Sequence, residues 1–73
     1  MNNDLEQRVL AAHIEGKRSD LVSLYQEAAA AAPSKDEYAF FLTQAYVFAL
    51  ETAHPDAPVL RDLLVQMERE TPL

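Results

Sequence analysis

The chain has 73 residues, of which 12 are acidic and six are basic, and its formal net charge is −6 at pH 7. A chain of this length forms a single domain, residues 1–73, and buries only about 60% of the surface that the unfolded form exposes. The absence of cysteine excludes disulfides, and the negative charge disfavours binding to the phosphate backbone of nucleic acids. Because small domains without disulfides or metals are commonly stabilised by association, the composition favours an oligomer.

The N-terminal residues are polar and acidic, which is unlike the basic start and apolar core of a secretory signal peptide. No run of about 18 apolar residues is present to span a membrane. A chain without cysteine also fits a reducing compartment. We therefore expect a cytoplasmic protein that does not bind membranes.

The first predicted helix covers residues 4 to 15. Asn3 followed by Glu6 is typical of a capping box at a helix start, and Gly16, the only glycine, is typical of a left-handed C-terminal cap. The apolar side chains of this segment spread over a wide surface rather than one narrow stripe. One face holds Leu5, Val9 and Ala12, while Leu10 and Ile14 lie well round the helix from them.

The second predicted helix covers residues 19 to 32, with Ser19 as the N-cap and Asp20 in the first turn. Its apolar residues follow helical spacing and predict one buried face, consisting of Leu21, Leu24, Tyr25, Ala28 and Ala32. The alanine run 28 to 32 favours a helix and leaves a smooth surface on which a neighbouring helix can pack closely. Pro33 ends the segment.

The third predicted helix covers residues 34 to 53 and begins with a capping box formed by Ser34 and Glu37. It holds five of the six aromatic residues and no charge between Glu37 and Glu51. Its predicted buried face consists of Tyr38, Phe41, Leu42, Ala45, Ala49 and Ala53. We therefore expect the other helices to pack around this one.

The reverse side of the third helix is also apolar. Phe40 and Val47 share a stripe with Gln44 and Glu51, and Phe48 lies on one flank. Two interpretations remain open: these residues pack against another helix of the same chain, or they meet a partner. Because the core of so short a chain is small, we favour a homodimer whose interface includes all five of these residues.

The fourth predicted helix covers residues 57 to 70, with Asp56 as a possible cap and Pro58 in the first turn. Its apolar stripe consists of Leu60, Leu63, Leu64 and Met67. The connections between the predicted helices are short, which makes consecutive helices antiparallel. The sequence therefore predicts an all-α domain of four helices in two consecutive antiparallel hairpins, either like tetratricopeptide repeats or as a small helical bundle.

The residues from Gly16 to Leu50 carry a resemblance to tetratricopeptide repeats. The matching positions are Gly16 at the turn between the helices, Tyr25 and Ala28 in the second helix, Pro33 at the end of the repeat, and Leu42 and Tyr46 in the next repeat. The sequence departs from the motif at Ala39, which replaces the signature tryptophan. The resemblance implies a protein-binding or self-associating helical module.

No motif for chemistry is evident. Phosphate-binding loops need several glycines, and this chain has one. His13 and His54 lie in different elements without metal-ligand spacing, so satisfied or exposed histidines are favoured over a metal site. Adjacent Asp36 and Glu37 point about 100° apart on a helix and are better explained as first-turn charges than as a catalytic pair. We expect no enzyme activity and no cofactor.

Two functions remain. The first is a protein–protein interaction or self-association module, whose partner is an unidentified protein or a second copy of the chain. The alternative is an acidic regulator or nucleic-acid mimic that sequesters a basic partner by charge.

Overall fold

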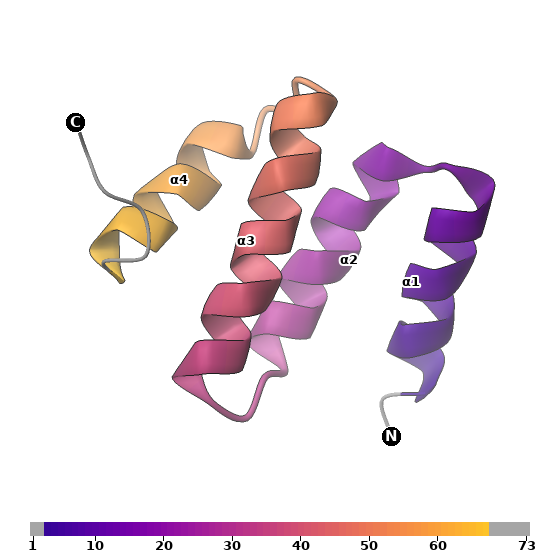
Figure 1. Cartoon of the computed structure of the whole chain (residues 1–73), viewed down its shortest axis with the longest axis horizontal. Helices are drawn as coiled ribbons and strands as arrows, with labels where there is room; N and C mark the ends of the chain where they lie inside the picture. Colours follow the sequence, from indigo (N-terminus) through magenta and orange to yellow (C-terminus); the bar gives the residue numbers. More distant parts are fainter. Residues whose placement is uncertain (1–2, 68–73) are drawn as a thin grey trace.

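The computed structural model describes residues 3–67. They form four α-helices and no strand: α1 (Asn3–Glu15), α2 (Arg18–Ala30), α3 (Lys35–Glu51) and α4 (Ala57–Gln66). The helices lie side by side in chain order, and consecutive helices run in opposite directions (Figure 1). The Cα atoms extend 35 and 28 Å along the longer axes and 13 Å along the shortest, so the molecule is flattened. The predicted all-α fold of consecutive antiparallel hairpins is confirmed.

The core consists of two clusters of buried side chains. The larger joins α2, α3 and α4 through Val22, Ala29, Leu42, Ala45, Ala49, Leu60 and Leu64. The smaller joins α1 to α2 through Ala12, Leu21 and Leu24. Among the described residues, the backbone of α1 approaches only that of α2, and α2 and α3 have the most extensive contact. The expectation that the other helices all pack around the third helix is therefore wrong, because α1 packs on α2.

Helix α2 has two buried faces, of which the sequence predicts one. Leu21 and Leu24 are buried, as predicted, and they pack against α1, whereas Val22 and Ala29 are buried in the cluster shared with α3 and α4. The prediction missed Val22 and Ala29 because it assumed one neighbour, and α2 lies between two. The alanines buried between α2 and α3 are small, which lets the two helix backbones approach closely.

Two helices end in a left-handed residue. Gly16 has φ 70°, and the Lys17 amide donates to the Ala12 carbonyl at 2.9 Å, as in a Schellman motif. The cap predicted at Gly16 is confirmed. Helix α2 then begins at Arg18 with Lys17 at the N-cap position and no side-chain cap, so the N-cap predicted at Ser19 is wrong. The Gly16 turn has already reversed the chain, and Ser19 lies within the first helical turn.

The same arrangement ends α3. Ala53 has φ 53°, and the His54 amide donates to the Ala49 carbonyl at 2.8 Å. The prediction that the third helix continues to Ala53, with this residue on its buried face, is wrong: α3 ends at Glu51 and Ala53 is exposed. The chain must turn here to begin α4, and a left-handed residue provides that turn.

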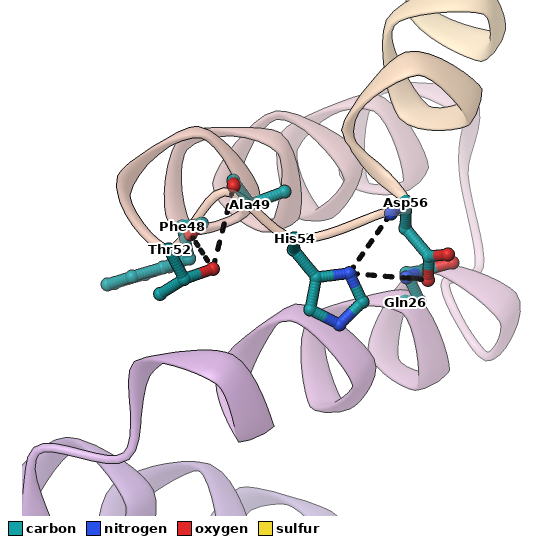
Figure 2. A network of polar contacts seen from close by, with 6 residues as sticks. All are labelled: Gln26, Phe48, Ala49, Thr52, His54 and Asp56. Atoms are coloured by element: carbon teal, nitrogen blue, oxygen red, sulfur yellow. Dashed lines mark hydrogen bonds and ion pairs between the residues drawn. The ribbon is translucent and has the colours of Figure 1, made fainter.

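Helices α3 and α4 start differently. The Ser34 hydroxyl accepts from the Glu37 amide at 3.2 Å, which confirms the predicted cap of α3. Pro58 lies in the first turn of α4, as predicted, but Asp56 makes no side-chain cap. Its carboxylate instead accepts from Gln26 Nε2 at 3.1 Å, which ties the turn before α4 to α2 (Figure 2). The cap predicted from the Asn3 side chain and the predicted extension of the fourth helix over residues 68–70 lie outside what the structure describes.

Candidate protein-binding groove

A groove of about 550 Å³ lies between α1 and α3, above the C-terminal part of α2. The α1 wall consists of Leu5, Glu6, Val9, Leu10 and His13. The floor consists of Tyr25, Ala28, Ala31, Ala32 and Pro33, and the α3 wall of Glu37, Phe40 and Phe41. Most of these side chains are apolar, so the groove can exclude water from an apolar ligand.

Leu10 and Phe40 are the open apolar groups of the two walls. Leu10 is 59% exposed because it lies on the side of α1 that turns away from the Ala12–Leu21 contact. Phe40 is 56% exposed, and its ring meets Phe41 edge to face with centroids 5.4 Å apart. Each wall therefore offers one large apolar side chain that is more than half exposed.

The floor of the groove is made of small side chains. Ala28 and Ala32 are half-buried, and Ala31 is exposed at the end of α2. The alanines lack bulk, so a ligand can approach the backbone of α2 closely. The sequence predicted that the alanine run packs against a neighbouring helix. In the structure Ala29 is buried in the core in this way, whereas Ala28, Ala31 and Ala32 form the floor of the groove.

A cluster of rings connects the two walls beside the groove. His13 Nε2 lies 2.9 Å from Tyr25 Oη, within hydrogen-bond distance. The rings of Tyr25 and Phe48 are stacked at 5° with centroids 5.9 Å apart, and Phe48 meets His13 edge to face at 5.6 Å. Burial raises the pKa of the Tyr25 phenol, because the charged form would lose solvation. These contacts hold α1 relative to α3 through side chains alone.

Of the five residues predicted as an interface, four stay at the surface along one stripe of α3, and Phe48 packs inside the chain. Phe40 lines the groove, whereas Phe48 is half-buried inside the chain and packs against both core clusters. Glu51 pairs with Arg18 at 3.3 Å. Val47 is 41% exposed and Gln44 is half-buried, and neither lines the groove.

Leu10 and Ala31 were missed as candidate site residues. One feature of the sequence could have indicated Leu10: it lies well round the first helix from the predicted buried face of Leu5, Val9 and Ala12. Nothing in the sequence indicated which neighbour would leave it uncovered.

Salt bridges brace the surface away from the groove walls. Arg8 donates to Glu27 at 2.7 Å and also pairs with Asp4 at 3.4 Å, so it links α1 to α2. The hydrogen bond from Arg8 lowers the pKa of the Glu27 carboxyl, and the same bond raises the pKa of Arg8. Lys17 pairs with Glu15 at 3.1 Å, and the hydrogen bond raises the pKa of the lysine.

The described residues hold no recognisable centre for chemistry. No three histidine, cysteine, aspartate or glutamate side chains between residues 3 and 67 gather as metal ligands. His54 Nδ1 accepts from the Asp56 amide at 3.1 Å, which holds the ring against the turn before α4 (Figure 2). Within the same residues, no helix is long and apolar enough to cross a bilayer.

Comparison with known proteins adds no relative. No protein-family model matches the chain, and no significant match is found among curated proteins or solved structures. Any functional interpretation of the groove therefore rests on its geometry and chemistry.

Proposed function

We propose that this protein is a small helical module that binds another protein and catalyses no reaction. The observation that carries the proposal is the groove between α1 and α3, in which Leu10 and Phe40 are each more than half exposed on opposite walls. Burying a leucine or phenylalanine side chain fully contributes about 1.5–3 kcal/mol. A partner that covers both side chains therefore obtains a large part of its binding free energy from these two contacts. The resemblance of Gly16–Leu50 to tetratricopeptide repeats also supports a protein-binding role.

A comparison of two matched variants tests this function. Phe40 in the groove and Val59 on α4 are both 56% exposed, so an aspartate at either position should leave the fold intact. Immobilised wild-type protein should retain a partner from cell extract that Phe40→Asp loses and Val59→Asp keeps. Equal retention by all three proteins would contradict binding through the groove.

Ionic strength separates this function from the acidic regulator. Capture by the apolar groove should persist at about 0.5 M salt, where charges more than a few ångströms apart are screened. Capture by charge alone should be lost under the same conditions. Loss of every retained protein in high salt would therefore favour an acidic regulator that sequesters a basic partner.

Self-association is a second candidate, favoured by the exposed stripe of Phe40 and Val47 on α3. Val47 is 41% exposed and lies outside the groove, so a second copy is able to cover it. A homodimer places the same patch of each subunit against the other, with an apolar centre and polar residues around it.

The substitution Val47→Asp tests the dimer. Because Val47 is exposed, the aspartate should leave the helices intact and dissociate the dimer into folded monomers, as measured by light scattering and circular dichroism. A collapsed fold would show that Val47 belongs to the monomer core. A wild-type protein that is monomeric at high micromolar concentration would exclude self-association.

A further inference from the structure

The charged side chains that line the groove are both acidic. Glu6 on α1 and Glu37 on α3 line opposite walls, and no lysine or arginine is among the described lining residues. The carboxylates of Glu6 and Glu37 have no ion-pair partner among residues 3–67, whereas Glu15, Glu27 and Glu51 each pair with a basic side chain. An occupant that brings positive charge to both edges of the groove would therefore pair with carboxylates that are otherwise unpaired.

The shape of the groove suits a helix. Its walls are two helices whose backbones do not contact one another, and its floor is built of alanines at the end of α2. The part of the chain that the structure describes contains no strand to which an extended peptide could add. An amphipathic helix presents apolar residues at spacings of three, four and seven along one face, and such a face fills an apolar groove between helices.

A second copy of this chain is a poorer occupant of the groove. The chain has a formal charge of −6, so another copy brings acidic surface toward Glu6 and Glu37. Three of its six basic side chains, Arg8, Lys17 and Arg18, already lie within 3.4 Å of acidic groups of their own chain. These three side chains are therefore already paired within the subunit.

We propose that the groove binds an amphipathic basic helix of a partner protein. The apolar face of that helix inserts between Leu10 and Phe40 and rests on Ala28, Ala31 and Ala32. Lysine or arginine residues that flank the apolar face pair with Glu6 on one side and Glu37 on the other. This inference rests on the proposed protein-binding function and specifies the chemistry of the partner.

Selection from a displayed library of random peptides tests the inference without knowledge of the natural partner. Peptides are selected on the immobilised wild-type protein after those that bind the bare support have been removed. The enriched sequences should carry apolar residues at helical spacing and lysine or arginine on both sides of them. A synthetic peptide of the enriched sequence should gain helical circular dichroism when it binds.

The affinity of that peptide for variants of the protein then tests the apolar and the acidic side chains of the groove separately. Phe40→Asp should weaken binding at least about tenfold, as expected for a central apolar anchor, and Val59→Asp should leave it unchanged. The double variant Glu6→Gln/Glu37→Gln should weaken binding several-fold at low salt and have little effect at about 0.5 M salt, because screening removes the charge contribution in both proteins. Glutamine at position 37 is compatible with the cap of α3.

Three results would overturn the inference. The first is that the enriched peptides lack helical spacing or carry acidic flanks. The second is that the peptide binds Phe40→Asp and wild type equally, and the third is that no peptide is specific for the wild type. In each case the protein-binding function is judged separately by the cell-extract experiment, which uses no peptide. If circular dichroism shows that Phe40→Asp is unfolded, Ala31→Phe replaces it, because Ala31 is exposed and a phenylalanine there fills the floor of the groove.

Discussion

Tyr25 connects the two parts of the core. Its ring packs against the cluster shared by α2, α3 and α4 and also against the cluster between α1 and α2. Phe48 does the same from α3, and the two rings are stacked. A tyrosine in this place brings a hydroxyl into a largely apolar environment, and His13 Nε2 is its hydrogen-bonding neighbour at 2.9 Å.

The raised pKa of the Tyr25 phenol predicts a loss of stability at alkaline pH. Burial disfavours the phenolate in the folded state, whereas the unfolded chain ionises at the ordinary tyrosine pKa of about 10. The stabilisation is therefore complete below pH 10 and is lost as the pH rises from there through the raised pKa. Urea unfolding at a series of alkaline pH values should show a steeper fall for wild type than for Tyr25→Phe.

The difference between the two proteins isolates this one group, since other titrations occur in both. Identical pH dependence would contradict the raised pKa of Tyr25. Tyr25→Phe also removes the contact with His13, so its stability near neutral pH is the reference for each series.

At the scale of the helix, α1 and α3 end in the same left-handed cap conformation, which a different residue type adopts in each. Gly16 takes the left-handed conformation after α1, and Ala53 takes it after α3. Glycine adopts this conformation without steric cost, whereas an alanine costs roughly 1–2 kcal/mol there. The cost at Ala53 is offset by the hydrogen bonds of the turn and by the packing of α4.

Opposite substitutions at these two positions should have opposite effects. Ala53→Gly should raise the free energy of unfolding by about 0.5–1 kcal/mol, because it relieves backbone strain. Gly16→Ala should lower it by about 1 kcal/mol, and only through the backbone, since an added Cβ at Gly16 meets no atom within 4 Å. Urea unfolding followed by circular dichroism measures both.

Ala11→Gly is the matched control. Ala11 is exposed within α1, where glycine should lower the free energy of unfolding by about 1 kcal/mol. If Ala53→Gly were destabilising to the same degree, residue 53 would not be left-handed in solution.

Across the whole molecule, α1 has the weakest attachment. Its backbone approaches only α2, just as that of α4 approaches only α3. However, α1 buries one side chain, Ala12, in the smaller core cluster, whereas α4 buries Leu60 and Leu64 in the larger one. A segment with few buried contacts opens at lower free energy than the rest of a protein. We expect the amides of α1 to exchange with solvent through a local opening, and those of α2 and α3 through global unfolding.

Native-state hydrogen exchange on Val9→Ala tests this division. Val9 is half-buried against the α1–α2 cluster, so its truncation should lower the opening free energy of the α1 amides by about 1 kcal/mol. Protection in α3 should stay unchanged. An equal loss of protection in α1 and α3 would show that the four helices unfold as one unit.

Local interactions explain the features that the sequence predicted correctly. The four helices, the Ser34 cap, the left-handed Gly16 and the place of Pro58 each depend on residues within about one helical turn of one another, so the sequence alone indicates them.

The tertiary structure decided which apolar faces are covered. Val22 and Phe40 both lie outside the faces predicted to be buried, yet Val22 is fully buried and Phe40 is 56% exposed. Phe48, predicted at an interface, instead packs within the chain against Tyr25 and His13. The cover of a helix face depends on where the neighbouring helices lie, which is set by packing between residues far apart in the chain. The groove exists for the same reason: the backbone of α1 packs on α2 and does not approach that of α3, which leaves Leu10 and Phe40 more than half exposed on the two walls.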